Sequence, residues 1–326
     1  MGQALAGGGR APARTRPAGQ PAVAGKPRRL ARRLEPYLLV GPAMLVLGLF
    51  FVWPVLYNLL LSFQSVSIFE LDRGGRWVGL QNYIEVWRDP LTPLSAQNTL
   101  VWLTLVTVAS RLVLGLGLAL LLNATVFRRW RLSGLVRTLL LIPWITPPVV
   151  AVAAWRWLLD GRYGAVNQLL VQAGLVRDGI PFLAQTSTVW PAIDAMVVWR
   201  DLPFVVVSVL AGLQSIPREL YEAARVDGAS EGRLLIHITL PQLRPVLTVV
   251  ALLTTIWTFN NFVYVWLATG GGPGNFTQVL ATRVFITAFT DYRLGAAAAI
   301  GVAMSLIMLV FAIVYFGVVF RQARER

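Results

Sequence analysis

The sequence is poor in three kinds of residue, and each scarcity excludes a class of chemistry. It has no cysteine, which excludes disulfides, thiol nucleophiles and cysteine-ligated metal ions. His237 is the single histidine, so little remains for imidazole catalysis or a histidine-rich metal site. Charged residues make up 13% of the chain and hydrophobic residues 56%, whereas a soluble domain is roughly a quarter charged. These proportions exclude a disordered chain, a coiled coil and a typical cytosolic enzyme, and they indicate a protein partly embedded in lipid.

Long apolar stretches recur along the chain, and each can cross a bilayer as a helix, which takes ~20 residues. They cover residues 36–62, 99–123, 138–159, 188–212, 245–268 and 294–320. The pattern predicts an all-α polytopic membrane protein, with six transmembrane helices in one domain of residues 35–326. Residues 1–34 precede this domain and are nearly free of large apolar side chains, so we expect a disordered basic tail.

The net charge of +14 alone could indicate a nucleic-acid binder, but its distribution favours another interpretation. Nineteen Lys and Arg residues fall in the tail, in the loops after the second and fourth spans, and after the last span. Seven fall in the loops on the other side. Because cytoplasmic loops are enriched in Lys and Arg, both termini are predicted to be cytoplasmic, and nucleic acid is not an expected partner.

The segment between the fourth and fifth spans, residues 214–242, is longer than a tight connection needs. Its apolar spacing predicts two short helices at the membrane surface, the first ending at Gly228 and the second stopped by Pro241. Such a pair suits docking into a groove on a partner, although a hairpin that only joins two spans is the alternative.

The spacing inside this segment is specific. Glu222-Ala-Ala is followed after three residues by Gly228, and after nine more by Ile238-x-Leu240-Pro241. The segment resembles the EAA coupling loop of ABC importer permeases, and the resemblance implies the type I ABC importer permease fold. Other stretches, including Val78-Gly-Leu-Gln-Asn-Tyr83 and Thr269-Gly-Gly-Gly-Pro-Gly274, resemble the carbohydrate-uptake branch, which includes the maltose permease F and glycerol-3-phosphate permease A types of subunit. The chain departs from many family members at Gly232 and Leu235, where aromatic residues are common.

The resemblance implies a permease subunit of a binding-protein-dependent importer, in the cell membrane of a prokaryote, that moves a sugar or glycerol-3-phosphate inward. The chain lacks the Gly-x-x-x-x-Gly-Lys phosphate loop of an ATPase, since its single Gly-Lys pair, Gly25-Lys26, is followed by Pro27. It is therefore not expected to be an enzyme, nor to hold a cofactor or metal of its own. The implied partners are a second homologous permease in a heterodimer, a cytoplasmic ABC ATPase dimer that binds ATP and Mg, and an extracytoplasmic solute-binding protein.

Two sets of residues are candidate sites. The coupling loop is expected to contact the ATPase through a polar contact of Glu222, through small residues that allow close approach, and through apolar residues that fill a notch. This set comprises Glu222, Ala223, Ala224, Asp227, Gly228, Leu235, Ile238 and Pro241. Polar and aromatic residues at membrane depth are candidates for holding a sugar, because polar groups are costly there. This set comprises Trp199, Arg200, Asp201, Trp257, Thr258, Phe259, Asn260 and Asn261.

Several alternatives stay open. Asn260 and Asn261 could form hydrogen bonds between helices, and Arg200 and Asp201 could pair with each other or with the partner permease. Arg111 is favoured as a helix-pairing or interfacial residue. An ABC permease for an amino acid or peptide is the alternative function. An ion-coupled secondary transporter is less favoured, because it needs internal repeats and intramembrane carboxylates.

Overall fold

The computed structural model describes residues 28–69, 74–124 and 132–324, and this part of the chain is mostly helical. The described residues up to Val55 and those from Leu56 onward form two compact units. The first unit contains α1 (Arg28–Leu47), the π-helical turn η1 (Gly48–Val52) and the beginning of α2 (Trp53–Ser62). Helix α1 begins at Arg28, so the last seven residues of the expected tail, residues 28–34, are helical. The run Arg-Arg-Leu-Ala-Arg-Arg-Leu consists of strong helix formers, which explains this difference. The rest of the expected tail lies outside the described residues.

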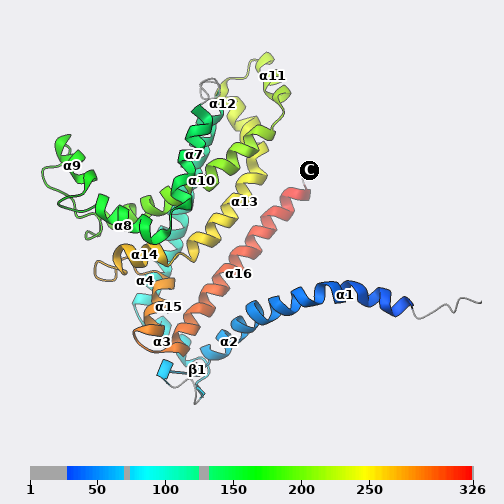
Figure 1. Cartoon of the computed structure of the whole chain (residues 1–326), viewed down its shortest axis with the longest axis vertical. Coiled ribbons are helices and arrows are strands. Elements are labelled where there is room, and N and C mark those ends of the chain that lie inside the picture. Colours follow the sequence, from blue (N-terminus) through cyan, green and yellow to red (C-terminus); the bar gives the residue numbers. More distant parts are fainter. Residues whose placement is uncertain (1–27, 70–73, 125–131, 325–326) are drawn as a thin grey trace, which may run out of the picture. The chain divides into compact units, whose positions relative to one another are not determined.

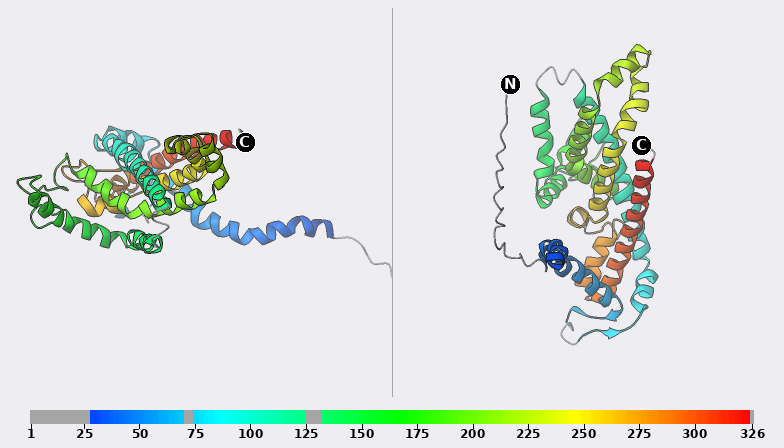
Figure 2. Two further views of the ribbon diagram at one scale, coloured as in Figure 1. Left: turned by 90° about the horizontal axis from the view of Figure 1, so that it is seen from above. Right: turned by 90° about the vertical axis from the view of Figure 1, so that its right-hand side faces the viewer.

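In the second unit the long helices α5, α10, α13 and α16 run alongside one another (Figures 1 and 2). Helices α11 and α12 lie at one end of this unit, and β1, α3 and α15 lie at the opposite end. The bounds are β1 (Gln64–Ser65), β2 (Arg76–Trp77), α3 (Gln81–Arg88), α4 (Leu91–Gln97), η3 (Asn98–Val106), α5 (Thr107–Asn123), α7 (Leu132–Ile145), α8 (Pro148–Leu158), α9 (Ala165–Gln172), α10 (Val189–Ser215), α11 (Arg218–Val226), α12 (Glu231–Leu234), η4 (Leu235–Thr239), α13 (Leu240–Phe259), α14 (Val263–Thr269), α15 (Leu280–Phe289) and α16 (Leu294–Arg324).

The expected membrane spans are largely present. In the described residues, five helices are long and apolar enough to cross a bilayer, or six if one bent pair counts as a span. The bent pair replaces the third expected span: its two halves, in α7 and α8, meet at an angle of 102°. Pro147 and Pro148 stand at the bend. Since proline has no N–H and disfavours a helical conformation for the residue before it, a straight helix cannot continue through this pair.

The fifth span is shifted toward the coupling loop relative to the expected residues 245–268. It runs continuously from Glu231 to Phe259, so Pro241 does not stop the second helix of the loop. The π turn η4 lies just before this proline, and such local adjustments allow a helix to tolerate it. The span ends where the Asn260 side-chain amide donates to the carbonyl of Ile256 at 2.9 Å. Asparagine amides compete with helix hydrogen bonds, and α14 is therefore a separate helix.

One face of the second span joins it to α10. The residues at every fourth position along one face of α5 are buried: Thr107, Arg111, Gly115 and Ala119. The Thr107 hydroxyl lies 2.5 Å from Asp194, and Arg111 lies 3.2 Å from Asp201. A Cβ on Gly115 would lie 2.5 Å from Cγ1 of Val205. The pairs advance together along both helices, so α5 and α10 run parallel and are joined by polar pairs and by a close backbone approach.

Gly115→Val is expected to lower the free energy of unfolding by about 1–3 kcal/mol, because the added side chain overlaps Val205 and forces α5 and α10 apart. Denaturant unfolding of the detergent-solubilised protein measures the change. Gly117→Val is the matched control, since a Cβ at Gly117 meets nothing within 4 Å. Equal losses in the two variants would contradict the packing argument.

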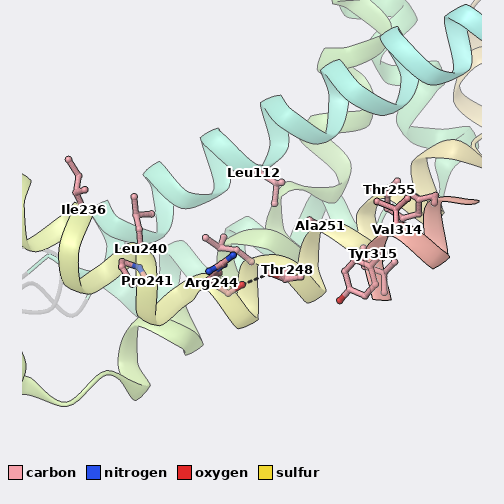
Figure 3. Close-up of a pocket in the computed structure, with 13 residues that line it drawn as sticks. Leu112, Ile236, Leu240, Pro241, Arg244, Thr248, Ala251, Thr255, Val314 and Tyr315 are labelled. Carbon is pink, nitrogen blue, oxygen red and sulfur yellow. Dashed lines mark hydrogen bonds between the residues drawn. The ribbon is translucent and has the colours of Figure 1, made fainter. Parts of the chain in front are cut away.

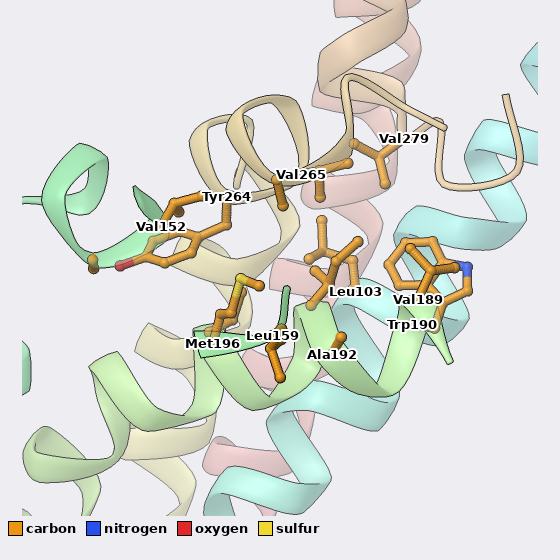
Figure 4. Packing of buried hydrophobic residues seen from close by; sticks show 14 residues of the cluster. Leu103, Val152, Leu159, Val189, Trp190, Ala192, Met196, Tyr264, Val265 and Val279 are labelled. Carbon is orange, nitrogen blue, oxygen red and sulfur yellow. The ribbon is translucent and has the colours of Figure 1, made fainter. Parts of the chain in front are cut away.

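A second core lies where the first half of α10 meets α8 and α14 (Figure 4). Trp190 and Met196 of α10 are buried there with Tyr264 of α14 and Val152 of α8.

Beyond α8, the Asp160 carboxylate accepts the backbone N–H groups of Arg162 and Tyr163 at 2.9 and 2.8 Å. These two bonds hold the pKa of Asp160 below its usual value. The core packs the first half of α10 against α8 and α14, and the turn at Asp160 leads into α9.

Candidate functional site

The coupling loop has the geometry expected for its first helix. Helix α11 begins after Pro217 and ends before Gly228, which has a φ of +76°. The Gly228 N–H donates to the carbonyl of Arg225 at 3.0 Å, and the Ala229 N–H donates to that of Ala224 at 2.9 Å. This pair of bonds is a Schellman cap, whose left-handed residue favours glycine. The prediction that Gly228 ends this helix is confirmed.

The loop is joined to the spans by residues on its inner side. The Tyr221 hydroxyl lies 3.1 Å from that of Thr239, and Ile238 packs against the apolar cluster that contains Val209 and Leu213. An exposed ion pair of 3.1 Å joins Arg225 to Glu231. Helix α11 is thereby attached to the beginning of the fifth span as well as to the end of α10.

The outer side of the loop is open to a partner. Glu222, Ala223, Asp227, Gly228 and Pro241 are exposed, whereas Ala224, Leu235 and Ile238 are half-buried. Since Ile238 contacts the chain's own core, other apolar side chains are more available to a partner. Val226 is 88% exposed and Ile236 is 60% exposed. Sequence reasoning missed these two, although large apolar residues in a polar loop are a recognisable signal.

Among the candidates at membrane depth, Asp201 is the centre of a buried ionic network. Its carboxylate lies 2.7 Å from Arg200 and 3.2 Å from Arg111, which is 0% exposed. Arg111 also donates to the Thr258 hydroxyl at 3.1 Å. Arg200 and Asp201 therefore pair with each other, and Arg111 is a helix-pairing residue that joins α5, α10 and α13. Sequence reasoning did not connect Arg111 to Asp201, because 90 positions separate them.

Three of the candidate sugar residues are not accessible: Asp201, which is 6% exposed and held in the ionic network, and also Phe259 and Thr258. Phe259 is 2% exposed and packs with Val86, Leu280 and Ile300. Thr258 is 1% exposed and donates to the carbonyl of Thr254 at 2.6 Å. Both residues face the protein because the helix turns them away from Trp257. The expectation that Phe259 and Thr258 contact a sugar is therefore corrected: neither side chain is open to a ligand. Only the packing of the helices shows this.

The accessible candidates form an aromatic surface beside the break in the fifth span. Trp257 is 44% exposed, and its ring meets that of Phe204 edge-on at 5.0 Å. Phe204 in turn contacts Trp144 at 5.2 Å. Sequence reasoning missed both partners, although Phe204 follows Arg200 by one helical turn.

The two asparagines and Trp199 complete the set. Asn260 is exposed, and Asn261 is half-buried and accepts the Tyr264 N–H at 3.2 Å. The hydrogen bonds found for these amides are local rather than between spans. Trp199 is half-buried and meets Trp155 edge-on at 5.9 Å. Within the described residues, no group of three or more His, Asp or Glu side chains could hold a metal ion.

Residues 112–324 match the family described as the inner membrane component of binding-protein-dependent transport systems. The chain belongs to this family. The family predicted from the spacing between Glu222 and Pro241 is thus confirmed, and the chain is a multi-pass membrane permease of a transport system.

Two curated relatives are sugar permeases by name. The sulfoquinovosyl glycerol transport system permease protein SmoG of Agrobacterium fabrum is 36% identical over 290 residues, covering 89% of this chain and 92% of SmoG. The trehalose/maltose transport system permease protein MalF of Thermococcus litoralis is 34% identical over 291 residues, covering 86% of this chain and 92% of MalF. This permease is thus related along nearly its whole length to subunits of sugar transport systems.

The fold is also that of a solved transporter. A chain in the crystal structure of a bacterial ABC transporter involved in the import of the acidic polysaccharide alginate matches with a TM-score of 0.75. The match covers 90% of this chain and 99% of that chain at 22% sequence identity. The type I ABC importer permease fold predicted from the sequence is confirmed.

Proposed function

We propose that this permease is one of two membrane subunits of a prokaryotic ABC importer that moves a sugar inward, with both termini cytoplasmic. The exposed coupling helix α11, ended by Gly228 and attached to two spans, carries the proposal. A second homologous permease would complete the pathway, an ABC ATPase dimer would bind ATP and Mg, and a solute-binding protein would deliver the sugar. The family and the named sugar permeases among the relatives support this assignment.

The contacts of α11 suggest how ATP binding reorients the spans. Closure of the ATPase dimer would displace α11 through Glu222 and its exposed neighbours. Because α11 is attached to both α10 and the beginning of the fifth span, a displacement passes to both. Arg111 joins the same two helices at membrane depth, so they would move as a unit.

The accessible sugar residues have the chemistry that a carbohydrate requires. A sugar ring has an apolar face that packs on an aromatic ring, and hydroxyls that pair with amides. Trp257 and Phe204 supply aromatic surface, and Asn260 supplies an exposed amide next to it. We place the sugar contact of this subunit there, facing the second permease.

Trp257→Ala is expected to raise the sugar concentration for half-maximal uptake roughly tenfold, since one aromatic contact in a site contributes on that scale. Uptake by the complete transporter in proteoliposomes measures it. Trp157→Ala, which removes a tryptophan that is 64% exposed on α8, is the matched control and should leave uptake unchanged. Equal effects of the two variants would contradict the assignment of Trp257.

The same preparation tests the function as a whole. Uptake should require ATP inside the vesicles and the loaded binding protein outside. ATP-independent uptake by this chain alone would instead show an ion-coupled transporter. The structure does not favour that alternative, because the intramembrane carboxylates of Asp194 and Asp201 are already engaged by Thr107 and Arg111.

A further inference from the structure

A groove of about 700 Å³ opens between α13 and α16, with Leu112 of α5 behind it (Figure 3). Figure 3 shows Thr255 near Val314 and Tyr315, with Arg244 farther along α13 toward the coupling loop. Trp257 and Asn260 are not among the lining residues. The groove is therefore separate from the surface assigned to the sugar.

The chemistry of the lining is that of an amphiphile site. Ten of the thirteen lining residues are aliphatic or aromatic, and none is acidic. Arg244 is exposed, and in the part of the chain that the structure describes no carboxylate forms an ion pair with it. The Thr248 hydroxyl already donates to the carbonyl of Arg244 at 2.6 Å. In the part of the chain that the structure describes, the groove thus offers one unpaired cation, Arg244, and its lining continues past Arg244 toward the coupling loop as the apolar residues Ile236, Leu240 and Pro241. These are too few polar groups for a sugar.

The part of the groove between Arg244 and Thr255 matches one leaflet of a bilayer in length. Arg244 and Thr255 are eleven residues apart on one helix, which corresponds to about 16 Å along the axis. The hydrocarbon core is ~30 Å thick, so one leaflet contributes about half of that. A molecule with its charged head at Arg244 would therefore reach the middle of the bilayer at Thr255.

We propose that this groove binds an anionic phospholipid of the leaflet on the coupling-loop side, with its phosphate on Arg244 and an acyl chain along Ala251 and Leu252. That this leaflet is cytoplasmic rests on the proposed function. Anionic lipids give the cytoplasmic leaflet its negative surface, and a guanidinium pairs with phosphate through two parallel hydrogen bonds. A lipid in this place contacts both α13 and α16, and it thereby links a span of the coupling loop to the last span.

The test measures lipid binding to the purified complete transporter by native mass spectrometry, with phosphatidylglycerol and phosphatidylcholine as probes. The wild type is expected to bind phosphatidylglycerol roughly fivefold more tightly, the contribution of one basic residue near anionic lipid. Arg244→Gln should remove this preference. Arg233→Gln removes the same charge from an exposed position outside the groove, and it should retain the preference. Equal binding of the two lipids by the wild type, or equal losses in both variants, overturns the proposal.

Two further measurements keep the proposal falsifiable. Ala251→Trp fills the groove and should abolish binding of both lipids. Should that variant not fold, a photo-crosslinking residue at Leu252 identifies the occupant directly: a lipid adduct supports the proposal, and a cross-link to another subunit overturns it. Sugar-stimulated ATPase activity of the same preparation tests the transport function separately. Normal stimulation without lipid preference overturns the lipid site alone, whereas lipid preference without stimulation contradicts the transport function alone.

Discussion

Asp201→Leu is expected to lower the free energy of unfolding by about 3–5 kcal/mol, the cost of leaving a buried charge without its partner. Arg111 is 0% exposed, and after this change its described contact is the neutral hydroxyl of Thr258. Denaturant unfolding of the detergent-solubilised permease measures the loss. Asp178→Leu, at an exposed carboxylate, is the matched control and should stay within about 0.5 kcal/mol of the wild type.

A double variant separates this ionic mechanism from a simple packing defect. Arg111→Met combined with Asp201→Leu removes both buried charges, and it should recover most of the stability lost in Asp201→Leu. Arg111→Met alone should cost less than Asp201→Leu alone, because Asp201 keeps Arg200 at 2.7 Å. A double variant as unstable as the sum of the single variants would show that the residues do not act as a pair.

Glu222→Lys is expected to abolish ATP-driven sugar uptake, with a loss on the order of a hundredfold or more, while the protein stays in the membrane. Glu222 is exposed on α11, so its reversal leaves the fold intact and places a like charge or an unpaired charge in the proposed interface. Uptake in cells that express the complete transporter measures the effect, with membrane levels checked by immunoblot. Asp178→Lys, a charge reversal at another exposed site, should transport normally.

Gly228→Pro tests the same coupling through the backbone. Proline cannot adopt a φ of +76° and has no N–H to donate to Arg225, so the cap of α11 is lost. Uptake should fall as in Glu222→Lys, although the spans are unchanged. Wild-type transport by both variants would contradict the role of the loop in coupling.

The sequence predicted the spans well where the signal is local and continuous. Twenty or more apolar residues must form a helix in lipid, since each backbone polar group needs an internal partner. The bend in the third span and the end of the fifth span were predictable in principle from Pro147-Pro148 and from Asn260-Asn261. The length of an apolar stretch alone does not show where a helix bends or ends. The coupling loop was found because its residues lie within one short segment. Its Gly228 was recognisable as the end of a helix, because glycine is the residue that most readily adopts a left-handed conformation.

Sequence alone determined that this chain is a polytopic permease with an EAA loop, because composition, apolar length and motif spacing depend only on neighbouring residues. The tertiary structure decided which polar residues at membrane depth are accessible. It buried Phe259 and Thr258, left Trp257 exposed, and joined Arg111 to Asp201. These outcomes depend on how each helix is rotated against its neighbours, and packing between distant segments sets that rotation. The low proportion of charged residues in the sequence is thus explained in part by the structure. Of the few charged side chains at membrane depth, Arg111 and Asp201 bind one another inside the protein.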